Sequence, residues 1–113
     1  MVTYADKKIK QVMDKITALG ISNNTVVFIL GDNGTSSDIT SQWNGQTVSG
    51  GKKSTINWAT NVPSLVIWPG HTSHISNTNL ISFTDYLPTI SDITGIAIPG
   101  GWGTIDGLSL IHI

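Results

Sequence analysis

Apolar positions near the start of the chain recur with helical spacing. Over residues 3–19 they follow one another at intervals of four, three, four and three, which places them on one face of an α-helix. We expect Thr3 and Asp6 to cap its beginning and Gly20 to end it, because glycine adopts the left-handed conformation without steric cost. An apolar stripe needs a partner surface, so this helix is predicted to cover another layer. The stripe consists of Ala5, Ile9, Val12, Ile16 and Leu19.

Two later apolar runs show no alternation, a pattern typical of strands that are covered on both faces. They span residues 25–30 and 63–68. A second helix is predicted over residues 83–94, with Gly95 ending it. A helix that leads into a buried strand indicates an α/β fold. The remaining stretches, 35–61, 71–80 and 96–113, are polar or glycine-rich without a period and are predicted to be loops.

Composition narrows the class of protein. The 113 residues lie within the usual size of one domain, so a single domain is expected over residues 1–113. The 39% hydrophobic content with 12 glycines excludes a wholly disordered chain. A net charge of −1 gives no electrostatic reason to expect nucleic acid or an anionic membrane as partner, and no apolar run approaches the ~20 residues of a membrane helix.

Cysteine and arginine are both absent from the chain, and all its anions are aspartates. The absence of cysteine excludes disulfides, thiolate zinc sites and a cysteine nucleophile within these residues.

The most specific chemical feature is Asp32-Asn33, which lies between two glycines directly after the first predicted strand. A carboxylate beside an amide carbonyl offers two hard oxygen donors, suited to Ca²⁺ or Mg²⁺. Open α/β sheets bind their ligands at the carboxyl ends of strands. The same residues also form a common turn sequence, and the local sequence alone favours that interpretation.

A second feature is the run Gly50-Gly51-Lys52-Lys53-Ser54-Thr55. Glycines followed by lysine and hydroxyl residues can surround an oxyanion with backbone N–H groups and an ammonium group. The run is not a phosphate-binding P-loop, because the first glycine and the strand-to-helix setting are missing. Taken in isolation, two solvated lysines in a flexible loop are the simpler interpretation.

Other candidates carry weaker signals. His71 and His74 lie three residues apart in a polar stretch, without a further ligand at metal-binding spacing, and surface histidines are the simpler interpretation. Asn23-Asn24-Thr25 satisfies the glycosylation pattern. Trp43, Trp58 and Trp102 lie in glycine- and asparagine-rich stretches, where they could line a glycan-binding cleft or anchor long loops.

Nine short segments carry a further signal through their order and spacing. They are Tyr4-Ala5-Asp6, residues 20–25 and 31–34, Gly51-Lys52, Val62-Pro63, Trp68-Pro69-Gly70, and residues 85–90, 94–96 and 106–110. Each segment alone is weak, but together they cover about residues 4–110, and they resemble the C-terminal half of the catalytic domain of type I sulfatases, in the alkaline-phosphatase superfamily. The resemblance implies a partial alkaline-phosphatase-like α/β domain with helices on a mostly parallel sheet.

The resemblance also implies roles for particular residues. Asp32 and Asn33 match the family's ligands of the catalytic Ca²⁺. Counting back from Val62-Pro63 matches Lys52 to the lysine that contacts the substrate sulfate, and Lys53 to a position where the family often has glycine. The implied reaction is hydrolysis of a sulfate ester of a carbohydrate or an aryl alcohol, and a periplasmic or secreted location is guessed from the family.

One departure from the family concerns the nucleophile. The family's formylglycine arises in a Cys/Ser-x-Pro-x-Arg motif, and this chain contains no such motif. The chain is therefore expected to be a fragment that lacks the nucleophile region and is inactive alone. The stretch after the lysine also departs from the family, because residues 56–61 contain no arginine.

Two alternatives remain at this point. A phosphoesterase or phosphotransferase of the same superfamily commonly has Asp-His-Gly at this place, and Asn33 argues instead for a cation that prefers oxygen. A non-catalytic glycan-binding module is favoured by the tryptophans and by the missing nucleophile.

Overall fold

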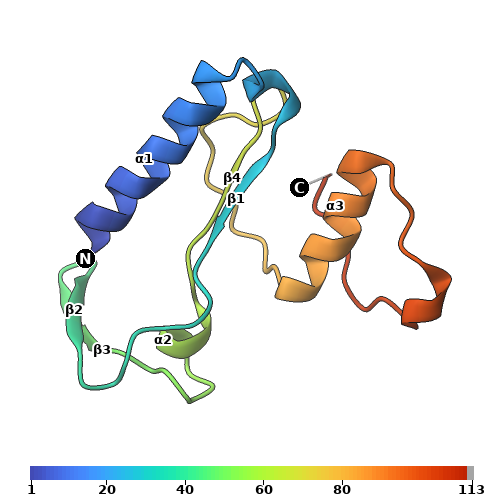
Figure 1. Ribbon diagram of the computed structural model, residues 1–113. Helices are drawn as coiled ribbons and strands as arrows, with labels where there is room; N and C mark the ends of the chain where they lie inside the picture. Colours follow the sequence, from blue (N-terminus) through green and yellow to red (C-terminus); the bar gives the residue numbers. More distant parts are fainter. Residues whose placement is uncertain (112–113) are drawn as a thin grey trace. The chain divides into compact units, whose positions relative to one another are not determined.

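The computed structural model describes residues 1–111 (Figure 1), so the last two residues of the predicted loop 96–113 lie outside it. The chain divides into two compact units, with the boundary between Ser73 and His74. The first unit holds two helices, one short 3₁₀ turn and two pairs of strands, and the second holds one helix with two 3₁₀ turns.

The predicted N-terminal helix is confirmed as α1, Val2–Ala18, followed by a 3₁₀ turn at Ser22–Asn24. Gly20 ends it with φ of 69°, as expected. The prediction of its cap was wrong. The helix begins at once, with the carbonyl of Met1 accepting hydrogen bonds from the N–H groups of Tyr4 and Ala5, so Thr3 and Asp6 lie inside the first turns.

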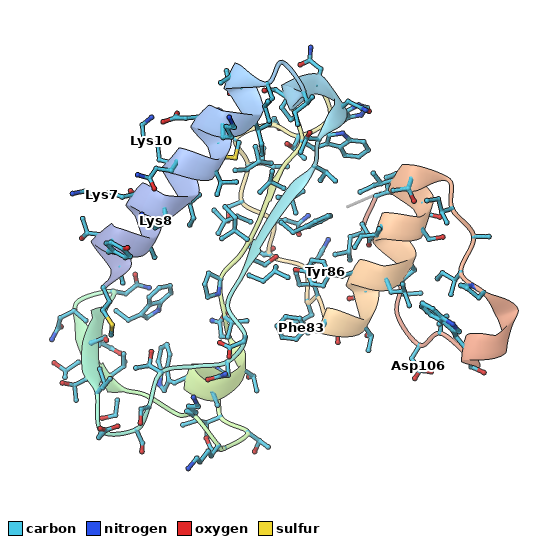
Figure 2. The ribbon with its side chains drawn as sticks, in the orientation of Figure 1. Lys7, Lys8, Lys10, Phe83, Tyr86 and Asp106 are labelled. Carbon is cyan, nitrogen blue, oxygen red and sulfur yellow. The ribbon has the colours of Figure 1, made fainter. Side chains whose placement is uncertain are left out.

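The exposed face of α1 carries its charges. Lys10 and Asp14 form an i,i+4 ion pair of 2.6 Å, worth a few tenths of a kcal/mol at such an exposed site. Figure 2 shows Lys7 and Lys10 projecting from the helix into solvent. The half-buried residues are Ile9, Met13 and Ile16. The buried stripe is therefore narrower than the one predicted, and Ala5, Val12 and Leu19 are exposed.

Both predicted strands form, as β1, Val27–Leu30, and β4, Ser64–Ile67. They pair with each other in antiparallel register, Val27 opposite Ile67 and Leu30 opposite Ser64, whereas a mostly parallel sheet was expected. Because the two strands are antiparallel, the chain between them leaves and re-enters at the same end of the pair. At this end the N–H of Gly31 donates to the carbonyl of Pro63 at 2.9 Å. Within residues 1–111 the pair gains no third strand, so its residues are half-buried or exposed rather than covered on both faces.

The polar stretch 35–61 is not the plain loop that was predicted. It contains a hairpin of β2, Thr40–Trp43, and β3, Gln46–Ser49, and the single helical turn α2, Asn57–Thr60. The hairpin turn consists of Asn44 and Gly45, with φ of 49° and 77°. This conformation suits an Asn-Gly hairpin turn, whose twist matches that of the flanking strands.

The second unit confirms the other predicted helix. A 3₁₀ turn, η2, Phe83–Asp85, leads into α3, Tyr86–Thr94, and Gly95 ends the helix with φ of 69°. A further 3₁₀ turn, η3, covers Gly100–Trp102. The rings of Phe83 and Tyr86 lie 6.2 Å apart at the start of α3 (Figure 2).

Two side chains of this unit tie the C-terminal segment to the start of α3. The carboxylate of Asp85 accepts from the N–H of Ser82 at 2.7 Å and from that of Leu108 at 2.9 Å. The Thr89 hydroxyl donates to the Asp85 carbonyl and accepts from the N–H of Leu110 at 2.8 Å. These hydrogen bonds satisfy backbone N–H groups that are not paired in a strand. They hold the C-terminal segment against the start of α3 without a sheet.

Little of the molecule is deeply buried. Among the described residues only Gly51, Ala59 and Thr89 are buried, and Ala59 and Thr89 still expose 8% and 3% of their surface. Large apolar side chains such as Leu65, 51% exposed, remain uncovered. No helix within residues 1–111 has the length and apolar character needed to cross a membrane.

The tie through Asp85 predicts a dependence on pH. The backbone N–H groups of Leu108 and Ser82 lower the pKa of the Asp85 carboxyl below its ordinary value of 3.8. Because the folded pKa is the lower one, the stabilisation is complete above pH 3.8 and is lost as pH falls through the folded pKa. In an NMR titration of the full chain, we expect the Leu108 amide shift to change with a midpoint below 3.8. Asp85→Asn should abolish this step, and a midpoint above 3.8 would contradict the tie.

Candidate functional site

The loop that follows β1 carries the first candidate residues. Asp32 and Asn33 are both exposed, and the Asn33 amide donates to the Asp32 carboxylate at 2.5 Å. Gly31 before them and Gly34 after them are anchored through their N–H groups, to Pro63 at 2.9 Å and to Ala59 at 2.8 Å. The backbone of this loop is therefore fixed at both ends, while its two polar side chains face solvent.

Gly34 allows the loop to lie directly against α2. A Cβ atom at this position would overlap the carbonyl oxygen of Trp58 and would lie 2.7 Å from the Cα of Ala59. Such distances are shorter than real Cβ contacts, so only glycine fits unless the backbone moves. The glycine after Asn33 thus serves close packing between two backbone segments.

The second candidate segment, residues 50–54, lies against the same loop. The Lys52 N–H donates to the Thr35 carbonyl at 3.0 Å, and the Gly50 N–H donates to the Ile39 carbonyl at 2.9 Å. A Cβ at Gly51 would lie 2.9 Å from the backbone nitrogen of Ala59. The strand-end loop, residues 50–52 and α2 therefore meet through their backbones.

Lys52 sits in a tight turn that presents its side chain outward. The N–H of Ser54 donates to the Gly51 carbonyl at 3.0 Å, and the Ser54 hydroxyl donates to the same oxygen at 2.6 Å. Within the turn Lys53 has φ of 74°, a left-handed conformation that favours glycine. Both lysines are exposed.

The structure thus places Asp32, Asn33 and Lys52 on adjoining loops. Their side chains do not pair: within residues 1–111, Asp32 forms no ion pair with a lysine. The described residues also contain no cluster of three or more His, Asp, Glu or Cys side chains that could hold a metal. Asp32 and Asn33 therefore offer a cation two ligands that fit in chemical type but are too few for a complete shell.

The weaker candidates separate into different settings. His71 stacks on Trp68, with ring centroids 3.9 Å apart, which agrees with a surface histidine packed on its neighbour. Trp43 and Trp58 come together, with ring centroids 6.3 Å apart and planes at 68°. Trp102 belongs to the second unit and is 65% exposed.

The Trp43–Trp58 contact was not predicted from the sequence. The signal for it was the Asn44-Gly45 dipeptide, which marks a hairpin turn and so places Trp43 at the end of a strand. The tryptophans border a hollow of about 210 Å³ that also reaches Asn33 and Gly34. Because residues 35–61 are polar and lack a period, their sequence did not indicate that they form a structured part of the candidate site.

Comparison with known proteins gives one consistent family. A family model described as sulfatase matches residues 1–96. An arylsulfatase of Hemicentrotus pulcherrimus is 25% identical over 92 residues, which cover 80% of this chain and 17% of that protein. Uncharacterized sulfatase YdeN of Escherichia coli (strain K12) is 30% identical over 110 residues, 97% of this chain and 19% of that protein. Arylsulfatase A of Bos taurus is 31% identical over 109 residues, which cover 93% of this chain and 20% of that protein.

The chain therefore spans about a fifth of the length of these curated relatives. No solved structure matches it at a significant level.

The close backbone contact at Gly34 is testable by substitution. Gly34→Ala should lower the free energy of unfolding by about 1–3 kcal/mol, the usual cost of overpacking, because its Cβ meets the Trp58 carbonyl. Gly101→Ala is the matched control, since a Cβ there meets nothing within 4 Å, and it should change stability by less than about 0.5 kcal/mol. Urea unfolding of the full chain, followed by tryptophan fluorescence, measures both. Equal effects would refute the packing role of Gly34.

Proposed function

The chain belongs to the sulfatase family, and from that premise we propose that it carries part of the active site of an enzyme that hydrolyses sulfate esters. The observation that supports this most is the contact between the loop of Asp32 and Asn33 and the turn of Lys52, through the 3.0 Å hydrogen bond from Lys52 to Thr35. The family's cation-binding pair and its sulfate-binding lysine correspond to these residues. We further propose that the chain is the C-terminal half of an alkaline-phosphatase-like catalytic domain.

Asp32 and Asn33 would hold Ca²⁺ in this enzyme. Their oxygens are of the hard type that Ca²⁺ prefers, but the ion takes roughly six to eight oxygen ligands. The Asn33 amide now donates to Asp32, and a bound cation would require the amide to present its carbonyl oxygen instead. The remaining ligands would come from sequence outside these residues and from water. When bound, the cation supplies charge that polarises a sulfate oxygen.

The geometry of the lysine turn supports the match of Lys52 to the sulfate-binding lysine. Alignment from Val62-Pro63 places Lys53 where the family often has glycine, and Lys53 has φ of 74°, a conformation that glycine adopts most readily. Shifting the alignment by one residue would put the favoured glycine at Ser54. The backbone therefore agrees with Lys52 as the residue directed at the substrate.

In the proposed reaction this chain binds and orients the substrate. The Lys52 ammonium would pair with a sulfate oxygen and stabilise the negative charge that the sulfuryl oxygens carry in the transition state. As the nucleophile bonds to sulfur, the electron pair of the breaking ester S–O bond goes to the oxygen of the leaving alcohol. The nucleophile would be a formylglycine supplied by sequence outside this chain, because these 113 residues contain no cysteine and no Ser-x-Pro-x-Arg motif. The substrate would be a sulfate ester of a carbohydrate or an aryl alcohol.

A phosphoesterase of the same superfamily remains the second candidate within this proposal. The observation that bears on it is Asn33, whose amide oxygen suits Ca²⁺ better than Zn²⁺. Activity on an aryl phosphate that exceeds activity on the matching aryl sulfate would favour this candidate.

The two adjacent lysines give a sharp test in the intact enzyme that carries this chain. Lys52→Ala should lower kcat by about 10²–10³, as for loss of one transition-state charge contact. Lys53→Ala removes an equal charge from the same turn and should change the free energies of activation and unfolding by less than about 0.5 kcal/mol. Steady-state kinetics on an aryl sulfate decides between them. Equal losses, or a larger loss for Lys53→Ala, would show that the alignment is wrong by one residue.

Asp32 and Asn33, the proposed cation-binding pair, give a second test on the 113-residue chain alone. With only two side-chain ligands, we expect weak Ca²⁺ binding, in the millimolar range of the weakest protein sites. Asp32→Ala should abolish the binding, whereas Asp38→Ala, which changes a nearby exposed aspartate, should leave it intact. Calorimetry checks this. A micromolar site that survives Asp32→Ala would contradict the assignment.

A further inference from the structure

The tip of the β2–β3 hairpin reaches α2 and forms one side of a hollow. Trp43 ends β2 and is 55% exposed, and Trp58 lies in α2 and is half-buried. Their rings meet edge to face at 6.3 Å, a favourable arrangement for aromatic pairs. The contact leaves part of the Trp43 ring open to solvent.

The hollow beside this pair is small and uncharged. Its volume is about 210 Å³, below the roughly 300–1,000 Å³ of pockets for drug-sized ligands, so it suits one ring of a ligand. None of its lining residues is charged. Besides the two tryptophans, the lining includes the polar residues Asn33, Ser41 and Asn61.

Two of these polar groups are available to a ligand. Within the described residues, the Asn61 amide and the Ser41 hydroxyl make no side-chain hydrogen bond. Amide and hydroxyl groups around an aromatic surface match the chemistry of a sugar ring, which has an apolar face of C–H groups and a rim of hydroxyls. A phenyl ring would use the aromatic surface but would leave the polar groups without partners.

We propose that this hollow is a subsite for one neutral sugar ring of the substrate, with Trp43 as its stacking surface and Asn61 and Ser41 as hydrogen-bonding partners. The inference rests on the proposed function only for the sulfate group. Asn33 belongs both to the hollow and to the cation pair, so a ring held in the hollow lies next to the groups proposed to bind its sulfate. Among the two substrate classes of the family resemblance, this selects a sulfated carbohydrate.

The first experiment measures binding of unsulfated sugars to the full chain by saturation-transfer NMR. The probes are methyl glycosides of galactose, glucose and N-acetylglucosamine, with phenol as the aryl comparison. At least one glycoside should bind, and Trp43→Ala should weaken it by about tenfold, the size expected when one stacking face is lost. Trp102→Ala is the matched control, since Trp102 lies in the other unit and is also exposed, and it should have no effect.

A second variant covers the case in which Trp43→Ala disturbs the hairpin. Asn61→Ala leaves the tryptophan pair in place and should weaken glycoside binding several-fold while leaving phenol binding unchanged. The proposal is overturned if no glycoside binds, if phenol binds better than every glycoside, or if neither Trp43→Ala nor Asn61→Ala weakens binding.

Unsulfated probes also separate this proposal from the sulfatase assignment. Asp32→Ala and Lys52→Ala should leave glycoside binding unchanged, because neither residue lines the hollow. In the intact enzyme, Trp43→Ala should raise KM for a sulfated glycoside about tenfold and leave kcat nearly unchanged. Glycoside binding that depends on Trp43, in an intact enzyme without sulfatase activity, would support the subsite and refute the proposed function.

Discussion

The first unit depends on a place where three backbone segments touch without intervening side chains. The loop after β1, residues 50–52 and the single turn of α2 meet there, joined by hydrogen bonds from Gly34 to Ala59 and from Lys52 to Thr35. Glycine is required because a Cβ at Gly34 or Gly50 would overlap a neighbouring carbonyl oxygen. In a unit whose large apolar side chains are half-buried or exposed, this contact fixes the positions of the candidate residues.

In these loops the backbone makes the structural contacts, and the candidate side chains take no part in them. The backbone of each loop is held, whereas the side chains of Asp32, Asn33 and Lys52 are exposed and make no ion pair within the described residues. The Lys52 ammonium can therefore bind an anion without first breaking an internal contact. The hydrogen bond from Asn33 to Asp32, in contrast, must break before both oxygens can face a cation. In the proposed function, Lys52 and a cation held by Asp32 and Asn33 would bind the anionic group of the substrate. In the further proposal, the hollow beside Trp43, which is lined by uncharged residues, would hold its neutral ring.

Sequence patterns predicted those elements that local periodicity determines. The helix over residues 2–18, both strands of the β1–β4 pair and α3 formed close to their expected ranges. Strand direction was not predictable, because the apolar run reports burial and does not identify its partner. The hairpin in residues 35–61 was missed because its residues are polar, although Asn44-Gly45 marked the turn. The tie from Asp85 to Leu108 spans 23 residues, a separation that no local pattern encodes.

Hydrogen bonds also connect some of the segments that carry the resemblance to sulfatases. Several of its segments touch in the structure: Gly31 bonds to Pro63, and the side chains of Asp85 and Thr89 bond to the segment of Leu108 and Leu110. These contacts join segments that lie far apart in the sequence. The chemical assignments rest on Asp32, Asn33 and Lys52 alone, which perform no such structural role through their side chains. The observed packing and the proposed chemistry of this chain therefore rest on different residues.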